Sequence, residues 1–121
     1  GAYGVAVDIA ESVSETVDEI KSKGGNAKAY NVENASEQQV VDFVADIKEH
    51  FGRIDVFFNN SCVDNAADRF HEYSIDVYDK IMNLDMRGTV FMTKMMLPLM
   101  MNQGGSIVNT SSFSGQAADL Y

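Results

Sequence analysis

The sequence predicts an α/β fold built on a doubly wound parallel sheet. Short apolar runs of strand length alternate with segments whose apolar residues recur at helical spacing, and the connections between them are short. This alternation is typical of crossover units, which place neighbouring strands parallel and helices on the faces of the sheet. Two of the apolar runs, residues 54–60 and 105–112, end in small polar residues. Because ligands bind at the carboxyl ends of strands in such sheets, we expect the functional site there.

Composition and charge are those of an ordinary globular domain. Hydrophobic residues make up 45% of the 121 residues and charged residues 22%, which argues against disorder. We find no repeat, low-complexity tract or linker, so we expect residues 1–121 to belong to one domain. The formal net charge of -9, from 18 acidic and 9 basic side chains, repels phosphate backbones. Nucleic acid is therefore not an expected partner.

The pattern also argues against a membrane segment, a disulfide and a metal site. One cysteine cannot form an internal disulfide, and two isolated histidines make no ligand cluster. The first residues do not have the basic and long apolar stretches of a signal peptide. The most apolar segment, residues 95–101, is far shorter than the roughly 20 residues that span a bilayer. We expect a cytoplasmic protein without a membrane or metal partner.

The first half of the chain alternates strand and helix. Residues 3–8 form an apolar run that ends in an acid and predict a strand. Residues 11–23 carry apolar side chains at helical spacing, and Gly24-Gly25 has the character of a helix C-cap. Residues 27–32 predict the second strand.

The next helix is expected to begin at Ser36. Gln39 stands three residues further on, which completes a capping box. The buried stripe predicted for this helix is Val40, Val44, Ile47 and Phe51, and Gly52 closes it.

The second half predicts two more strands and two more helices. Residues 54–58 are apolar on both faces, as expected for a central parallel strand with helices on each side. Residues 74–101 predict two helices that meet near residues 83–88. Gly104-Gly105 ends this region, and residues 106–110 predict the last strand.

The order of strands in a doubly wound sheet indicates that one strand is missing from this sequence. In the order 3-2-1-4-5-6, a Gly-rich turn follows strand 1, and the acid that binds the adenosine ribose ends strand 2. Asp8 ends the first strand here, so the four strands correspond to strands 2 to 5, and strand 1 belongs between the first and third of them. Without it, two buried strand edges stay unpaired, which is costly. We expect an incomplete fold that lacks the first strand with its Gly-rich turn and the C-terminal part.

Four strand ends carry motifs in the order of a known family. They are Asp8, Asn31-Val32, Asn59-Asn60-Ser61-Cys62, and Ser111-Ser112 with Gly115 three residues later. Together they resemble the short-chain dehydrogenase/reductase family, whose domain is Rossmann-like, over residues 8–115. On this resemblance, residues 1–121 are a partial dinucleotide-binding domain. The resemblance implies an NAD(H)-dependent oxidoreductase that interconverts an alcohol and a ketone.

The resemblance also implies a cofactor site at the strand ends. The carboxylate of Asp8 would accept hydrogen bonds from the ribose 2′- and 3′-hydroxyls and repel a 2′-phosphate, which favours NAD over NADP. Asn31-Val32 would lie against the adenine ring. The cofactor-binding residues implied are Asp8, Ile9, Asn31, Val32, Asn60, Ser61 and Thr110.

Two residues of the third motif depart from the family's Asn-Asn-Ala-Gly. Ser61 replaces alanine, which is a mild change, and Cys62 replaces glycine. A side chain at this position narrows the cofactor cleft or requires another backbone angle. Cys62 is either a reactive thiol or a packed core group, and we favour the packed group.

Ser112 matches the family's catalytic serine. Its hydroxyl would hydrogen-bond the substrate oxygen while a tyrosine exchanges the proton and the nicotinamide exchanges hydride. Thr110, Ser111 and Ser114 are structural alternatives, since such residues are common in loops. The family's tyrosine lies thirteen residues after the serine, whereas Tyr121 lies nine after it, so we expect the catalytic tyrosine beyond the given sequence.

The family's catalytic asparagine corresponds, counted back from Gly88, to Asp85. Asn83 stands two residues earlier and is the alternative if the helix is shifted. An aspartate accepts the same hydrogen bonds as an asparagine but cannot donate them.

The second-half helices carry a dense group of methionines: Met92, Met95, Met96, Met100 and Met101. Core packing is one explanation. Relatives often pair this helix with its copy, so we expect a homodimer or homotetramer through it. Two other functions stay open: a degenerate member that binds a dinucleotide as a sensor or scaffold, favoured by Cys62 and Asp85, and a fragment without activity.

Overall fold

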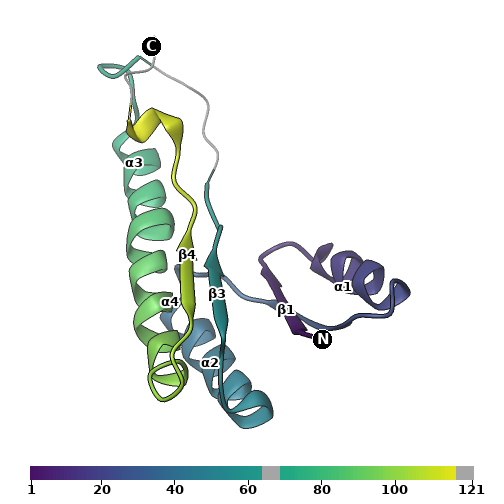
Figure 1. Cartoon of the computed structure of the whole chain (residues 1–121). Coiled ribbons are helices and arrows are strands. Elements are labelled where there is room, and N and C mark those ends of the chain that lie inside the picture. Colours follow the sequence, from purple (N-terminus) through teal and green to yellow (C-terminus); the bar gives the residue numbers. More distant parts are fainter. Residues whose placement is uncertain (64–68, 117–121) are drawn as a thin grey trace.

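The computed structural model describes residues 1–63 and 69–116. Strands and helices alternate through most of this part of the chain (Figure 1). The elements are β1 (Tyr3–Asp8), α1 (Val13–Ser22), β2 (Asn26–Asn31), α2 (Glu37–Phe51), β3 (Val56–Asn59), α3 (Ile75–Ile81), the π-helical segment η1 (Met82–Gly88), α4 (Thr89–Met96), the 3-10 turn η2 (Leu97–Leu99), β4 (Ser106–Asn109) and the 3-10 turn η3 (Phe113–Gly115).

The four strands form two separate parallel pairs. β1 pairs with β2, with Asp8 opposite Asn31, and β3 pairs with β4, with Asn59 opposite Asn109. Within the described residues, β1 and β3 do not pair with each other, and the β1–α1 unit stands apart from the β3–β4 pair (Figure 1). This is the arrangement predicted for a doubly wound sheet without its middle strand.

The hydrophobic core lies between α2, α4 and the inner face of β3. Its buried members are Val32, Val40, Phe43, Val44, Ile47, Met92, Met96 and Leu99. Phe57 of β3 packs against this cluster. Of the predicted stripe of α2, Val40, Val44 and Ile47 are buried, and Phe51 is partly buried against the cluster; Phe43 belongs to the buried face as well.

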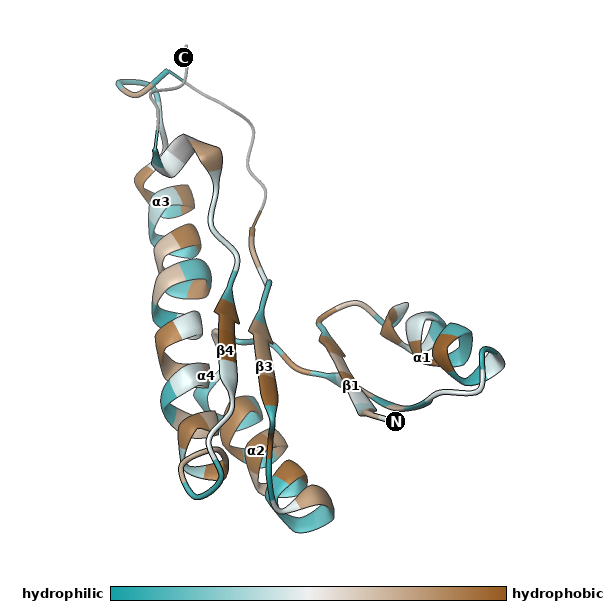
Figure 2. Ribbon diagram, in the orientation of Figure 1, coloured by the Kyte–Doolittle hydropathy of each residue, from teal (hydrophilic) through white to brown (hydrophobic). Residues whose placement is uncertain are grey.

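Among the residues that the structure describes, helices cover only one face of β3. Val56 and Phe58 point the other way and are 64% and 58% exposed, so hydrophobic residues are prominent along this strand (Figure 2). The prediction of helices on both faces is wrong for the described residues, because α2 and α4 lie on the same side. The alternating burial along β3 is that of a strand with one open face.

The caps of α2 follow the sequence with one difference. The Ser36 hydroxyl accepts the Gln39 N–H at 3.5 Å, as expected of an N-cap. The Gln39 side chain, however, accepts the N–H of Glu33 at 2.8 Å instead of that of Ser36, so the capping box is closed one turn earlier. At the other end Gly52 adopts φ 70°, a left-handed conformation that glycine reaches without strain.

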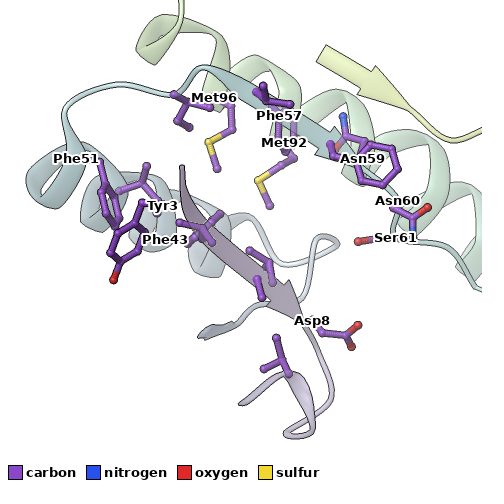
Figure 3. A pocket seen from close by; sticks show the side chains of 18 of the residues that line it. Tyr3, Asp8, Phe43, Phe51, Phe57, Asn59, Asn60, Ser61, Met92 and Met96 are labelled. Atoms are coloured by element: carbon purple, nitrogen blue, oxygen red, sulfur yellow. The ribbon is translucent and has the colours of Figure 1, made fainter. Parts of the chain in front are cut away.

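A cleft of about 820 Å³ separates the two strand pairs (Figure 3). Residues of β1 and β3 form two of its walls. Apolar side chains of α2 and α4 form its floor, among them Phe43, Ile47, Met92 and Met96. Val13 of α1 lines it as well. The cleft therefore lies between β1 and β3, which have no strand partner on this side within the described chain. Apolar side chains of α1, α2 and α4 line it.

Candidate functional site

A smaller cleft of about 240 Å³ lies where the carboxyl ends of β1 and β3 come together. Five of the predicted cofactor-binding residues line it, namely Asp8, Ile9, Val32, Asn60 and Ser61. Asp8 at the end of β1 and Asn60 and Ser61 beyond β3 also line the large cleft (Figure 3). The two remaining residues, Asn31 and Thr110, do not line the small cleft; they contact residues that do.

The carboxylate of Asp8 is exposed at the end of β1. Its Oδ1 accepts the N–H of Ala10 at 2.9 Å, which fixes the turn after the strand. The Asp8 carbonyl accepts the N–H of Val32 at 3.1 Å and joins this turn to the end of β2. Since a carboxylate has acceptor sites on two oxygens, Asp8 keeps acceptor capacity for a ligand hydroxyl.

Asn31 supports the same turn. Its Nδ2 donates to the carbonyl of Ile9 at 2.8 Å. Val32 is buried in the core cluster as well as bordering the small cleft. These two residues thus shape the wall of the small cleft, Asn31 by holding backbone and Val32 by packing.

The ends of β3 and β4 are joined by side chains. Thr110 Oγ1 donates to Asn60 Oδ1 at 2.7 Å, and the Thr110 N–H donates to the Asn59 carbonyl at 2.9 Å. Thr110 therefore orients Asn60, and this leaves the Asn60 amide nitrogen as the group that can donate to a ligand.

Cys62 is exposed and lines the small cleft. The preference for a packed core group is wrong, because β3 ends at Asn59 and Cys62 lies beyond the last strand residue. Its thiol therefore stands at the rim of the small cleft, where the family has a glycine.

Asp85 lies in the π-helical segment η1, half-buried. Its Oδ1 accepts the N–H of Val63 at 2.9 Å, so it holds the chain that follows β3. Asn83 is exposed. Of Asp85 and Asn83, the two alternatives for the family's catalytic asparagine, the structure places Asp85 against the segment after β3.

Gly88 lets η1 approach the loop after β2. A Cβ at Gly88 would lie 3.2 Å from both the Cβ and the carbonyl oxygen of Asn34, which is closer than most such contacts. Asn34 and Leu84 also line the small cleft, and sequence reasoning did not identify either. Leu84 precedes Asp85 directly, and this adjacency to a candidate residue was its one signal.

Ser112 lies in the exposed segment between β4 and η3, and its carbonyl accepts the N–H of Gly115 at 3.1 Å. Ser112 and Asp85 are not among the described residues that line either cleft. Tyr121 lies outside the described residues.

Two further observations concern ions and membranes. Within residues 1–63 and 69–116, no three His, Cys, Asp or Glu side chains are grouped so that they could hold a metal ion. In the same residues, no helix combines the length and the apolar character needed to cross a bilayer.

Comparison with known proteins places the chain in a family. The family model described as short chain dehydrogenase matches residues 1–119. The chain therefore belongs to the short-chain dehydrogenase family, and the resemblance drawn from the four strand ends is confirmed.

Several members of the family are close in sequence or structure. Uncharacterized oxidoreductase YxbG of Bacillus subtilis is 44% identical over 121 residues, which are 99% of this chain and 44% of that protein. Meso-2,3-butanediol dehydrogenase of Serratia marcescens is 35% identical and matches 98% of this chain and 47% of its own length. The crystal structure of an NAD+-bound xylitol dehydrogenase superposes with a TM-score of 0.89 at 26% identity, over 95% of this chain and 45% of that one.

The chain thus spans about half the length of the relatives it matches. The structural similarity confirms the predicted fold class, an incomplete, Rossmann-like doubly wound α/β fold.

Proposed function

We propose that the full-length protein containing this chain transfers a hydride between NAD(H) and an alcohol or ketone. The observation that carries the proposal is the small cleft, where the exposed carboxylate of Asp8 and the polar groups of Asn60 and Ser61 line one space at the carboxyl ends of two strands. In doubly wound sheets this is the position where dinucleotides bind. The similarity to an NAD+-bound xylitol dehydrogenase supports the same class of cofactor.

The charge of the small cleft favours NAD(H) over NADP(H). Asp8 is its acidic group, and the described residues that line it include no lysine, arginine or histidine. A carboxylate in this position accepts hydrogen bonds from ribose hydroxyls and repels a 2′-phosphate. Asn31 and Val32 would keep the wall beside the adenine in place.

The reaction would take place at the end of β4. A bound nicotinamide ring supplies or accepts the hydride. We assign Ser112, which lies in an exposed segment after β4, the role of hydrogen-bonding the substrate oxygen. We assign Asp85 to the same site, where its bond to the Val63 N–H fixes the segment after β3.

The test compares binding and turnover in the full-length protein and its Ser112→Ala variant. Binding of NADH is measured by fluorescence titration, and turnover by the absorbance of NADH with a panel of alcohols and ketones. We expect the variant to bind NADH as the wild type does and to lose at least about a hundredfold in kcat, since the hydroxyl acts on the reacting oxygen. Ser14→Ala, on the exposed face of α1, is the control.

Each outcome separates the candidate functions. Binding with no turnover in the wild type would support the dinucleotide-binding sensor or scaffold instead of the enzyme. An unchanged kcat in Ser112→Ala would contradict the role of Ser112. If neither NADH nor NADPH binds, both functions fail.

We further propose that the protein pairs with a second copy through α3, η1 and α4. Exposed apolar side chains recur along these elements at helical spacing, and they are Ile75, Tyr78, Met82, Met86 and Val90. Leu97 of η2 and Met101 just after η2 are exposed as well. Of the methionines singled out in the sequence, Met92, Met96 and Met100 are instead buried, and Met101 is exposed. The proposed interface therefore consists mainly of residues other than the methionine group that the sequence indicated. Exposed stripes of this length mark interaction sites.

Sedimentation of the full-length protein tests this proposal. Met86 and Val90 are 57% and 61% exposed near the middle of the stripe, and replacing both with lysine should give monomers. Val41→Lys, on the exposed side of α2, should leave the assembly unchanged. A double variant that sediments like the wild type would contradict the interface.

A further inference from the structure

A buried polar side chain lies directly beneath the ends of β3 and β4. Asn59 is 8% exposed, and it is the buried polar side chain of the described chain. A buried amide is costly unless its donors and acceptor are paired. The hydrogen-bond partners of the Asn59 amide therefore show how the protein stabilises this buried side chain.

Asn59 links helix α4 to the end of β4. Its Nδ2 donates to Thr93 Oγ1 at 3.0 Å and to Asn109 Oδ1 at 2.8 Å. The Thr93 hydroxyl in turn donates to the carbonyl of Thr89 at 2.8 Å. A continuous chain of hydrogen bonds thus runs from the α4 backbone through two side chains to the last residue of β4.

The directions of these bonds are set from the helix outward. The Thr89 carbonyl can only accept, so the one hydrogen of the Thr93 hydroxyl is used there. Thr93 can then only accept from Asn59, which requires the amide nitrogen of Asn59 to face it. Because that nitrogen also donates to Asn109, the carbonyl oxygen of the Asn109 side chain faces inward and its amide nitrogen faces away from Asn59.

This chain matters for the segment that contains Ser112. β4 has four residues and ends at Asn109, and Ser112 follows three residues later. Beyond the strand, the backbone tie to β3 is the Thr110 N–H to the Asn59 carbonyl. The Thr110 hydroxyl also donates to Asn60, and the side chain of Asn59 adds a third tie, one residue earlier, to Asn109.

We propose that Thr93 is a positioning residue of the site: through Asn59 it fixes the orientation of Asn109 and the place of the Asn109-to-Ser112 segment. The proposal rests on the proposed function in so far as Ser112 acts on substrate. Small displacements of a reacting group are expensive, since about 1 Å can cost a hundredfold in rate. Thr93 would therefore affect the chemical step without touching substrate or cofactor.

The experiment uses three variants of the full-length protein. Thr93→Val keeps the shape of the side chain and removes the acceptor of Asn59, whereas Thr93→Ser keeps the hydroxyl. We expect kcat to fall about tenfold or more in Thr93→Val, with KM changed less than about twofold, and to return to within about twofold in Thr93→Ser. Asn109→Ala breaks the same chain at its exposed end, and it should reproduce the effect should Thr93→Val fail to fold.

Val44→Ala is the matched control. Val44 is buried in α2 and belongs to the core but not to the hydrogen-bonded chain, so it lowers stability without altering the strand ends. Hydrogen exchange of a peptide that contains residues 109–112 is compared in all variants. Each variant is measured the same number of degrees below its own melting temperature. Under these conditions, we expect faster exchange of this peptide in Thr93→Val and Asn109→Ala than in Val44→Ala.

The results distinguish this proposal from the function it builds on. Equal exchange and equal kcat in Thr93→Val and Val44→Ala would overturn the positioning role while leaving the enzyme intact. If the wild type shows no turnover, the proposed function fails, and the exchange comparison alone supports or overturns the role of Thr93.

Discussion

Individual side chains at the strand ends divide into those that hold local backbone and those that remain open to a ligand. Asn31 and Asp85 belong to the first group, since they bind the Ile9 carbonyl and the Val63 N–H. Cys62 belongs to the second, because it is exposed at the small cleft. Asp8 belongs to both, since its Oδ1 accepts the Ala10 N–H while its side chain is exposed at the same cleft.

Asp85 provides the first prediction. Asp85→Asn keeps an oxygen that can accept the Val63 N–H, so stability and kcat should stay close to those of the wild type. Asp85→Ala removes the acceptor and should cost about 1–2 kcal/mol in the free energy of unfolding. Urea denaturation and steady-state kinetics of the full-length protein check both. Equal losses in the two variants would mean that the charge of Asp85 matters beyond this hydrogen bond.

Gly88 provides the second prediction. An added methyl group at this buried position would press on the Asn34 backbone and Cβ. Overpacking of this kind costs about 1–3 kcal/mol, so Gly88→Ala should lower the free energy of unfolding by that amount. Lys48→Ala, on the exposed face of α2, should change it by less than about 0.5 kcal/mol. A Gly88→Ala protein as stable as the control would show that η1 can move away from the loop.

Among the secondary-structure elements, β2 and α2 are joined by a group of polar side chains. Asp46 of α2 accepts hydrogen bonds from the Tyr30 hydroxyl and, at 3.0 Å, from Lys28 Nζ. His50 lies 3.2 Å from the same carboxylate. The hydrogen bond from Tyr30, and to a smaller extent that from Lys28, lowers the pKa of Asp46 below its usual value of 3.8.

This shift predicts acid sensitivity of the β2–α2 contact. A carboxylate whose pKa is lower in the folded state adds stability at pH above its unfolded value, and this contribution is lost as the pH falls through the folded value. The melting temperature of the wild type should therefore fall more steeply below about pH 4 than that of Asp46→Asn. Asp18→Asn, at an exposed site of α1, serves as control. Parallel curves for wild type and Asp46→Asn would contradict the prediction.

The sequence predicted most elements to within two residues. β1, α1 and α2 follow apolar periodicity and capping residues, because Ser36, Gly24 and Gly52 mark helix ends by local chemistry. The open face of β3 could not be predicted, because Val56 and Phe58 are apolar whether or not a helix covers them. Nor could the π-helical η1, since apolar spacing does not distinguish it from two helices that meet there.

The sequence placed the candidate site at the strand ends but did not reveal its side-chain contacts. Asp8, Asn60 and Ser61 were singled out because polar residues end apolar strands there, and in the structure these three residues line one cleft. The exposure of Cys62 depends on where β3 ends, which the sequence places only to within a residue or two. The chain from Thr93 to Asn109 joins three elements, and no local pattern in the sequence relates them.

At the scale of the whole chain, the described residues form two strand pairs on either side of a large cleft with apolar and polar lining residues. The membership of the chain in the short-chain dehydrogenase family explains both pairs and their parallel strands. The small cleft lies at one end of this architecture, where β1 and β3 both end. We propose that this end of the molecule binds NAD(H) and that Asp8 decides between NAD(H) and NADP(H).

The most direct test is to titrate the full-length protein and its Asp8→Ala variant with NADH and NADPH. We predict that the wild type binds NADH at least about tenfold more tightly than NADPH, and that Asp8→Ala weakens NADH binding by about tenfold or more and removes the preference. Asp18→Ala should behave as the wild type. Tighter binding of NADPH by the wild type, or an unchanged preference in Asp8→Ala, would contradict the claim.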